Sequence, residues 1–173
     1  MENMHLNAEG ELVIRPSVTS AATDFDFLLG NHIVEHKKLG TRLTGSDDWI
    51  EFQGTHTQES LLGGLGNLEQ QEMTPPDGYT IKGIALRLFN PLTSLWTIYW
   101  ADNISATLDK PVVGSFQDGI GYFFTKDKFN GQSILVQFKW DLTNPQHPVW
   151  SQAFSADAGK SWEWNWHMKF SRR

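Results

Sequence analysis

Several polar side chains stand in otherwise apolar, strand-like segments, where they could hold a ligand or move a proton. His56 shares a face with Ile50 and Phe52 in an alternating segment, so its imidazole is expected to point inward. Arg87 and Tyr99 lie on consecutive segments, and if both face the interior they could grip a carboxylate or a phenolate. The alternative is an outward-facing Arg87 that pairs with an acid.

Histidines are the first candidates for acid–base chemistry. His36, His56 and His167 could act, with Asp102 and Tyr99 as partners. No Gly-x-Ser-x-Gly elbow accompanies them, so no catalytic residue is assigned. The residues predicted to contact a ligand are His36, His56, Asn67, Arg87, Tyr99, Trp100 and Trp140.

The segment His32-Ile33-Val34-Glu35-His36 matches the H-x-x-E-H pattern of inverted zinc peptidases. That chemistry requires a helix, which stacks positions i and i+4 on one face. On a strand, which rises about 3.3 Å per residue, the two histidines stand about 13 Å apart and cannot share one ion. Because the segment follows Gly30 and leads into a hairpin, we predict a strand here and no metal site.

Two further motifs are interpreted as structural. Gly63-Gly64-Leu65-Gly66-Asn67 lacks the Lys-Ser/Thr ending of a phosphate loop, so its glycines are expected to turn a corner, with Asn67 near the cavity mouth. The run from Ser155 to Trp162 fits the Asp-box pattern S-x-D-x-G-x-x-W. A single copy without an arginine cluster predicts a hairpin braced by Asp157.

Almost every segment after Gly30 is typical of a β-strand. Turn pairs such as Asp118-Gly119 and Asn130-Gly131 separate the segments and favour tight hairpins. Because ten strands in one open sheet would leave two unpaired edges, we predict an all-β, closed, antiparallel up-and-down barrel; a two-sheet sandwich is the alternative. The strands are predicted at residues 32–39, 48–59, 64–73, 79–89, 95–102, 111–117, 120–128, 132–141, 148–156 and 162–171.

Alternation assigns apolar faces on two of these strands. We expect the interior to receive Ile134, Val136, Phe138 and Trp140 from one strand, and Trp162, Trp164, Trp166, Met168 and Phe170 from the last. Ahead of the strands, residues 24–29 predict a short N-terminal helix that ends at Gly30. Residues 1–22 are polar and poorly patterned, which indicates a loosely ordered leader before a single barrel domain at 23–173.

The composition limits the class of partner. A net charge of −6 and a pI near 5.4 argue against nucleic acid and anionic membranes. The absence of Cys excludes disulfides, thiolate metal sites and a Cys nucleophile. The first ten residues lack the pattern of a signal peptide, so a cytoplasmic location is expected. The 8 Trp and 11 Phe supply the bulk that a barrel interior needs.

From Phe25 onward the chain resembles an uncharacterised bacterial family of calycin-like barrels, distant relatives in shape of lipocalins, fatty-acid-binding proteins and nitrobindins. The resemblance rests on residues 25–30, 61–67, 86–91, 96–100, 111–114 and 162–170. It implies the barrel but no activity. Lipocalin-like barrels usually open with Gly-x-Trp, whose indole plugs the floor against an Arg near the last strand. Here His32 takes that place, with Arg172 and Arg173 at the far end, so either the floor is built differently or His32 has another task.

Three functional hypotheses follow. The leading one is a barrel that binds a small hydrophobic or aromatic molecule, with Arg87, Tyr99 and His56 as polar anchors and no cofactor. Haem is disfavoured, because the closing-segment pattern around the haem-binding histidine of nitrobindins is lacking. The alternative is a cofactor-independent cyclase, isomerase or lyase that acts on an enclosed metabolite. The third is a self-associating structural protein, and a homodimer is compatible with each.

Overall fold

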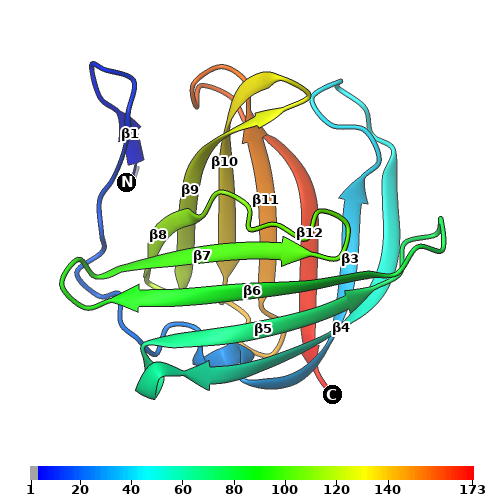
Figure 1. Cartoon of the computed structure of the whole chain (residues 1–173), viewed down its shortest axis with the longest axis horizontal. Helices are drawn as coiled ribbons and strands as arrows, with labels where there is room; N and C mark the ends of the chain where they lie inside the picture. Colours follow the sequence, from blue (N-terminus) through cyan, green and yellow to red (C-terminus); the bar gives the residue numbers. More distant parts are fainter. Residues whose placement is uncertain (1–3) are drawn as a thin grey trace.

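A computed structural model describes residues 4–173 and contains a closed barrel of ten antiparallel strands (Figure 1). The barrel strands are β3 (Gly30–Leu39), β4 (Trp49–Leu61), β5 (Gly66–Met73), β6 (Ile81–Asn90), β7 (Leu95–Asp102), β8 (Val112–Gln117), β9 (Ile120–Phe129), β10 (Gln132–Asp141), β11 (Val149–Ser155) and β12 (Glu163–Arg172). Each lies within two residues of its predicted bounds. The predicted all-β closed barrel is confirmed.

The strands pair in chain order, and β12 pairs with β3 to close the barrel. Strands β4 to β7 cross in front of β9 to β12, so the barrel has two layers of differently directed strands (Figure 1). The two predicted Asx-Gly hairpins are present. Asp118 and Gly119 have φ values of 52° and 79°, and Asn130 and Gly131 have 49° and 81°, which is the left-handed geometry that these residue types tolerate.

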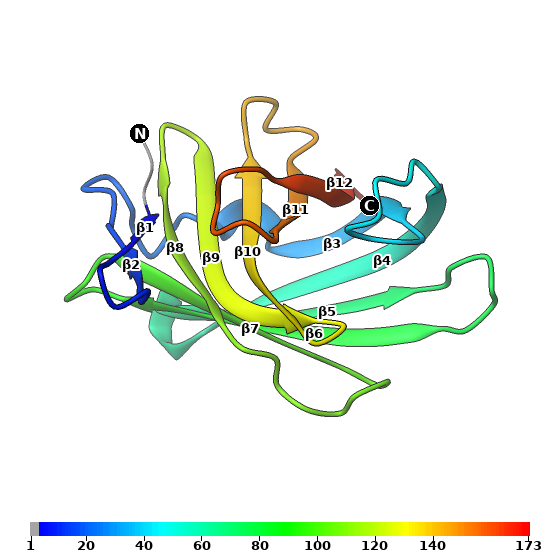
Figure 2. The same ribbon diagram turned by 90° about the horizontal axis from the view of Figure 1, so that it is seen from above.

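The segment before the barrel carries a small hairpin of β1 (Met4–Leu6) and β2 (Leu12–Ile14) at one side of the barrel (Figure 2). Lys126 Nζ of β9 donates to the Gly10 carbonyl in the turn of this hairpin at 2.7 Å. Further along, the backbone N–H of Ser17 donates to Ser115 Oγ at 2.9 Å, and the N–H of Phe116 donates to Ser20 Oγ at 3.3 Å. These bonds join residues 17–20 to β8. The leader boundary at residue 22 stays a prediction.

The helix predicted over residues 24–29 is not supported. This stretch contains only a single 3-10 turn, η1 (Asp26–Leu28). The physical reason lies in its caps and its burial. The Asp24 carboxylate accepts from Ser20 Oγ at 2.6 Å and from the Ala21 N–H at 3.0 Å, so it closes the preceding turn instead of starting a helix. Phe25 and Leu28 are both fully buried, and a three-residue spacing suits a 3-10 turn.

Phe25 forms the floor of the barrel. Its ring is fully buried and packs edge-to-face against Trp96 at 4.9 Å and Phe116 at 5.1 Å between ring centroids. The floor is therefore built differently from the Gly-x-Trp pattern, with a Phe supplied by the segment before β3. His32 instead packs against His56 on the wall, at 5.1 Å between ring centroids. Arg172 donates to the Leu29 carbonyl at 3.2 Å.

The side chains of the last strand do not all face inward as predicted. A β-bulge shifts the register so that Gln152 pairs with Trp166 and Ala153 pairs with Trp164. The bulge leaves Trp166, Met168 and Phe170 facing inward, as predicted, but turns Trp164 to the outer surface, where it stacks near His167. Alternation alone cannot locate a bulge, so the inward face predicted for Trp164 is wrong. The inward prediction for Trp162 is wrong too, because Trp162 precedes β12 and packs near Phe124, the outward neighbour of the cavity-lining Thr125.

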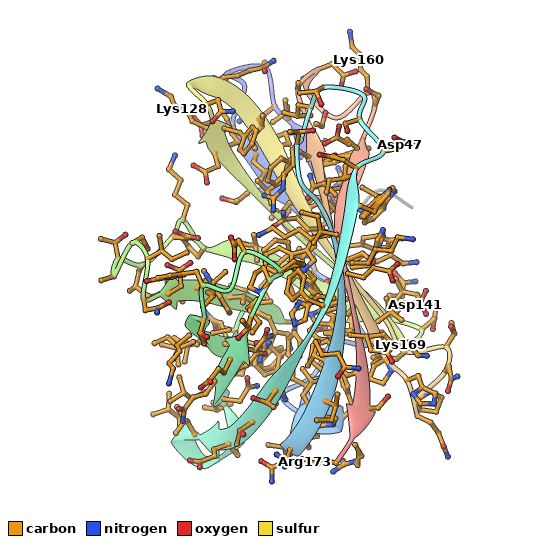
Figure 3. The ribbon with its side chains drawn as sticks, turned by 90° about the vertical axis from the view of Figure 1, so that its right-hand side faces the viewer. Asp47, Lys128, Asp141, Lys160, Lys169 and Arg173 are labelled. Atoms are coloured by element: carbon orange, nitrogen blue, oxygen red, sulfur yellow. The ribbon has the colours of Figure 1, made fainter. Side chains whose placement is uncertain are left out.

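The predicted hairpin brace between β11 and β12 is confirmed. The hydroxyl of Ser155 donates to Asp157 at 2.8 Å, and the Ser161 N–H donates to the same carboxylate at 2.9 Å. Figure 3 shows Lys160 of this connection and Lys128 of β9 at one end of the barrel, with Arg173 at the opposite end. Among residues 4–173, no helix has the length and apolarity required to cross a membrane.

Candidate functional site

The barrel encloses a cavity of about 290 Å³ that runs from a charged mouth to a polar closed end. Six aromatic side chains line its wall, which gives a flat molecule large surfaces to lie against. The aromatic lining residues are Trp100, Phe138, Trp140, Trp150, Phe154 and Trp166, and the aliphatic ones are Ala85, Ile98, Val112, Val136 and Met168. The indole of Trp100 lies over Gly83, where a Cβ would come within 2.2 Å of the ring.

A buried ion pair, Glu69 of β5 with Arg87 of β6, lies at the closed end. Arg87 Nη2 donates to Glu69 Oε2, and both side chains line the cavity. Arg87 Nη1 donates to Gln58 Oε1 at 2.7 Å and to Asn67 Oδ1 at 3.1 Å. The guanidinium is thus fixed by acceptors from two strands, Gln58 on β4 and Asn67 and Glu69 on the adjacent β5, which is typical of a preorganised anchor.

The carboxylate of Glu69 has two further neighbours. Gln71 Nε2 donates to Glu69 Oε1 at 2.5 Å, and His56 Nε2 lies 3.3 Å from Glu69 Oε2. Burial alone would raise the pKa of Glu69, but the charge of Arg87 and the contact with His56 outweigh it and hold that pKa well below its usual range. The group is therefore an anion at the closed end of the cavity.

The Arg87 guanidinium also lies over aromatic rings. Its Cζ is 4.8 Å from the centroid of the Phe25 ring and 6.0 Å from that of Trp140. Arg87 Nε and Gln71 Oε1 are buried and have no hydrogen-bond partner within residues 4–173. His56 Nδ1 is buried in the same way, so the closed end holds polar atoms beyond those that its own network uses.

His36 lies on the inner face of β3, behind Trp166. Its ring stacks on Phe52 at 4.7 Å between centroids, and Trp166 Nε1 donates to His36 Nδ1 at 3.3 Å. Burial, followed by the charge of Lys38, lowers the pKa of His36 to about 4, so the ring is neutral near pH 7. Gly54 makes room for it, because a Cβ there would stand 2.9 Å from His36 Nε2.

The predicted site residues fall into three groups. Arg87, Trp100 and Trp140 line the cavity. Asn67 and His56 contact the Arg87–Glu69 pair, and His36 supports the wall behind it. Whether they bind a ligand stays a prediction.

Tyr99 does not share the interior with Arg87. Arg87 pairs with Ile98, and Ile98 and Trp100 both line the cavity, so the side chain between them points outward. The proposed joint grip of Arg87 and Tyr99 on one ligand is therefore wrong. The alternative of an outward-facing Arg87 is wrong as well.

The sequence reasoning missed Glu69 and Gln71, although a signal was present. Asn67, Glu69 and Gln71 recur at every second position, and Asn67 pairs directly with Arg87. This pattern indicates one polar strand face opposite an arginine. Lys38 and Arg42 line the mouth but carry no such signal. A Lys at a strand end is typical of a solvated surface, and Arg42 lies in the loop after β3.

The mouth carries charges of both signs. Besides Lys38 and Arg42, it is lined by Asp102, Asp109, Lys110 and Asp127. Burial, together with the charges of Asp102 and Asp127, raises the pKa of Asp109. No group of three or more His, Asp or Glu side chains within residues 4–173 is arranged to hold a metal ion.

No protein-family model matches the chain, and a search of curated proteins returns no match. Among solved structures, the barrel is similar to that of CPES, an S-type phycobiliprotein lyase from Guillardia theta, with a TM-score of 0.61. The alignment covers 90% of this chain and 94% of the lyase chain at 9% sequence identity. At that identity the likeness shows the fold alone, a lipocalin-like barrel.

Proposed function

We propose that this protein binds a small apolar or aromatic molecule inside the barrel, with Arg87 as the polar anchor at the closed end. The single observation that carries this proposal is the aromatic cavity of about 290 Å³ that ends on a buried Glu69–Arg87 pair. Binding sites commonly combine such walls with a few fixed polar groups.

The polar network itself supports a binding role. A buried ion pair seldom stabilises a fold more than well-packed apolar residues of the same volume would. Here the Glu69 and Arg87 side chains line a cavity and leave it open, whereas larger apolar side chains would fill it. Trp100 and Trp140 would contact the ligand, while His56 and Asn67 would position the anchor. His36 would hold the Trp166 wall through its hydrogen bond.

A second candidate is a cofactor-independent cyclase, isomerase or lyase that uses the same cavity. The specific observation is the Glu69 carboxylate, which lines the cavity 3.3 Å from a histidine nitrogen of His56. An ionised carboxylate fixed beside the cavity can stabilise positive charge that develops on an enclosed substrate. The structural neighbour named above is a lyase, which supports a reaction in a barrel of this shape only at the level of the fold. A cytoplasmic location, a bacterial source and a homodimer stay predictions.

Native mass spectrometry tests the binding proposal directly. The protein is incubated with a panel of fatty acids, haem, phenolics and neutral aromatic dyes, and retained mass is recorded. We expect a one-to-one complex with at least one apolar or aromatic compound, and weaker retention by Trp140→Ala. No retained compound across the panel would count against the proposal.

A further inference from the structure

Two cations stand on one aromatic wall at the mouth of the cavity. Lys38 Nζ lies 4.2 Å from the centroid of the Trp166 ring. Arg42 Cζ lies 5.9 Å from the same ring and 5.4 Å from the Phe154 ring. Both side chains are half-buried and line the cavity, so their charges face the space that a ligand would occupy.

Neither cation has an acidic partner. Within residues 4–173, no carboxylate oxygen lies within 4.0 Å of the Lys38 ammonium or the Arg42 guanidinium, although seven such pairs occur elsewhere. Burial, followed by the charge of Arg42, lowers the pKa of Lys38 to about 8, against a smaller opposing effect of Asp102 and Asp77. Two like charges in a desolvated place favour the approach of an anion.

The acids across the mouth are largely engaged elsewhere. Asp102 Oδ1 accepts from the backbone N–H groups of Ile104 and Ser105, each at 3.0 Å. Asp127 Oδ1 lies 4.0 Å from the ammonium of Lys110. These two acids are therefore engaged by their own loop and by Lys110. The acid whose charge acts on Arg42 is Glu163, and both of its oxygens accept the N–H of Leu43.

The loop that carries Arg42 is fixed to the barrel. The backbone N–H of Leu43 donates to both oxygens of Glu163 on β12, at 2.8 and 2.9 Å. Leu43 itself packs against the core with a φ of 58°. Because the next residue is held in this way, the Arg42 guanidinium is preorganised over the Phe154 and Trp166 rings, and little side-chain entropy is lost when it binds.

We propose that Lys38 and Arg42 form a subsite for an anionic group of the ligand, such as a carboxylate, sulfonate or phosphate, at the mouth of the cavity. The inference rests on the proposed function and narrows the ligand class to aromatic or apolar molecules with an anionic end. The apolar body lies between the aromatic walls, and the anion accepts charge-assisted hydrogen bonds from the two cations.

A matched pair of probes tests the subsite. Anilinonaphthalene sulfonate and N-phenylnaphthylamine share the same ring framework, but only the first carries an anionic group. Both are titrated by calorimetry into the wild type, Lys38→Met and Arg42→Met at low ionic strength. Lys37→Met is the control, because Lys37 is the outward neighbour, is 51% exposed and pairs with Glu51.

We expect each cavity variant to weaken binding of the sulfonate by about tenfold or more, since a hydrogen bond to a charged group contributes about 1.5–3 kcal/mol. Binding of the neutral probe should stay unchanged in both variants, and Lys37→Met should alter neither. Lys38→Arg keeps the positive charge, so it should bind the sulfonate more tightly than Lys38→Met does. This result would show that the loss in Lys38→Met comes from the missing charge and not from a folding defect.

The possible results separate the two proposals. If the neutral probe binds, and the sulfonate binds Lys38→Met and Arg42→Met as tightly as it binds the wild type, the anionic subsite is wrong. The proposal of a ligand-binding barrel then still stands. If neither probe binds the wild type with saturation, the proposed function itself fails.

Discussion

The carboxylate of Glu69 and the guanidinium of Arg87 form an ion pair across neighbouring strands, with only 2% and 4% of their side-chain surface exposed. Four other side chains converge on the pair: Gln58, Asn67, Gln71 and His56. An ion pair this deep is retained at a cost in desolvation, and it lies beside a cavity rather than in packed core. We infer that it serves the contents of the cavity.

Replacing one partner of this pair should destabilise the fold strongly. Arg87→Met leaves the Glu69 carboxylate buried without its counter-charge, and we expect a loss of about 3–5 kcal/mol in the free energy of unfolding. The double variant Arg87→Met/Glu69→Leu should lose clearly less than the sum of the two single changes. Urea unfolding followed by tryptophan fluorescence measures both, and strictly additive losses would argue against the pairing.

A second prediction concerns Phe25, which forms the floor of the barrel. Phe25→Ala removes a fully buried ring that contacts Trp96 and Phe116, so we expect a loss of about 3–5 kcal/mol in unfolding free energy. Phe27→Ala is the matched control, since Phe27 is only partly buried two residues away, and its loss should be smaller. Equal losses would show that Phe25 has no special place in the floor.

A buried neutral histidine makes stability depend on pH. The pKa of His36 falls from 6.5 to about 4 on folding, so the unfolded chain binds more protons between these values. His36 thus contributes stability that is fully present above pH 6.5 and is lost as the pH falls toward 4, up to about 3 kcal/mol. We expect His36→Phe to flatten the decline in urea stability over this range. An unchanged slope in the variant would contradict a neutral, buried His36.

The anionic subsite has its own pH signature. Lys38 carries its charge below a pKa of about 8, and a bound anion raises that value further. Affinity for anilinonaphthalene sulfonate should fall as the pH rises through 8 and above, while affinity for N-phenylnaphthylamine stays level. This fall in affinity should be absent in Lys38→Met. Its absence would separate the titration of Lys38 from that of the other charged groups near Lys38 or at the mouth of the cavity, which are Arg42, Asp77, Asp102, Asp109, Lys110 and Asp127.

The sequence predicted the strands well because their ends carry chemical markers. Pairs such as Asn130-Gly131 fix a hairpin by their tolerance of positive φ, and alternation fixes the strand between two such turns. The same alternation divides the side chains of a strand between its two faces. When both faces hold apolar side chains, it does not show which face lies inside the barrel. On β6, Leu86 faces outward while Ala85 and Arg87 face the cavity.

Other features depend on contacts far apart in the sequence. Only the register of β5 and β6 shows that Asn67 stands opposite Arg87, and only the bulge at Gln152 and Ala153 turns Trp164 outward. Arg42 lies in a loop whose path is set by Glu163, 120 positions along the chain from Leu43. No local pattern carries that information.

The most direct test of the central claim is a titration of N-phenylnaphthylamine into three proteins. Ala85 lines the cavity, so Ala85→Phe places a ring inside it, while Leu86→Phe places the same ring on the outer face of the same strand. Thr125→Trp, from the opposite wall, fills the cavity independently should Ala85→Phe lose its folded structure.

We predict saturable one-to-one binding by the wild type and by Leu86→Phe, and its loss in a folded cavity-filled variant. Equal binding by the wild type and the cavity-filled variant, or no saturable binding by the wild type, would contradict the account.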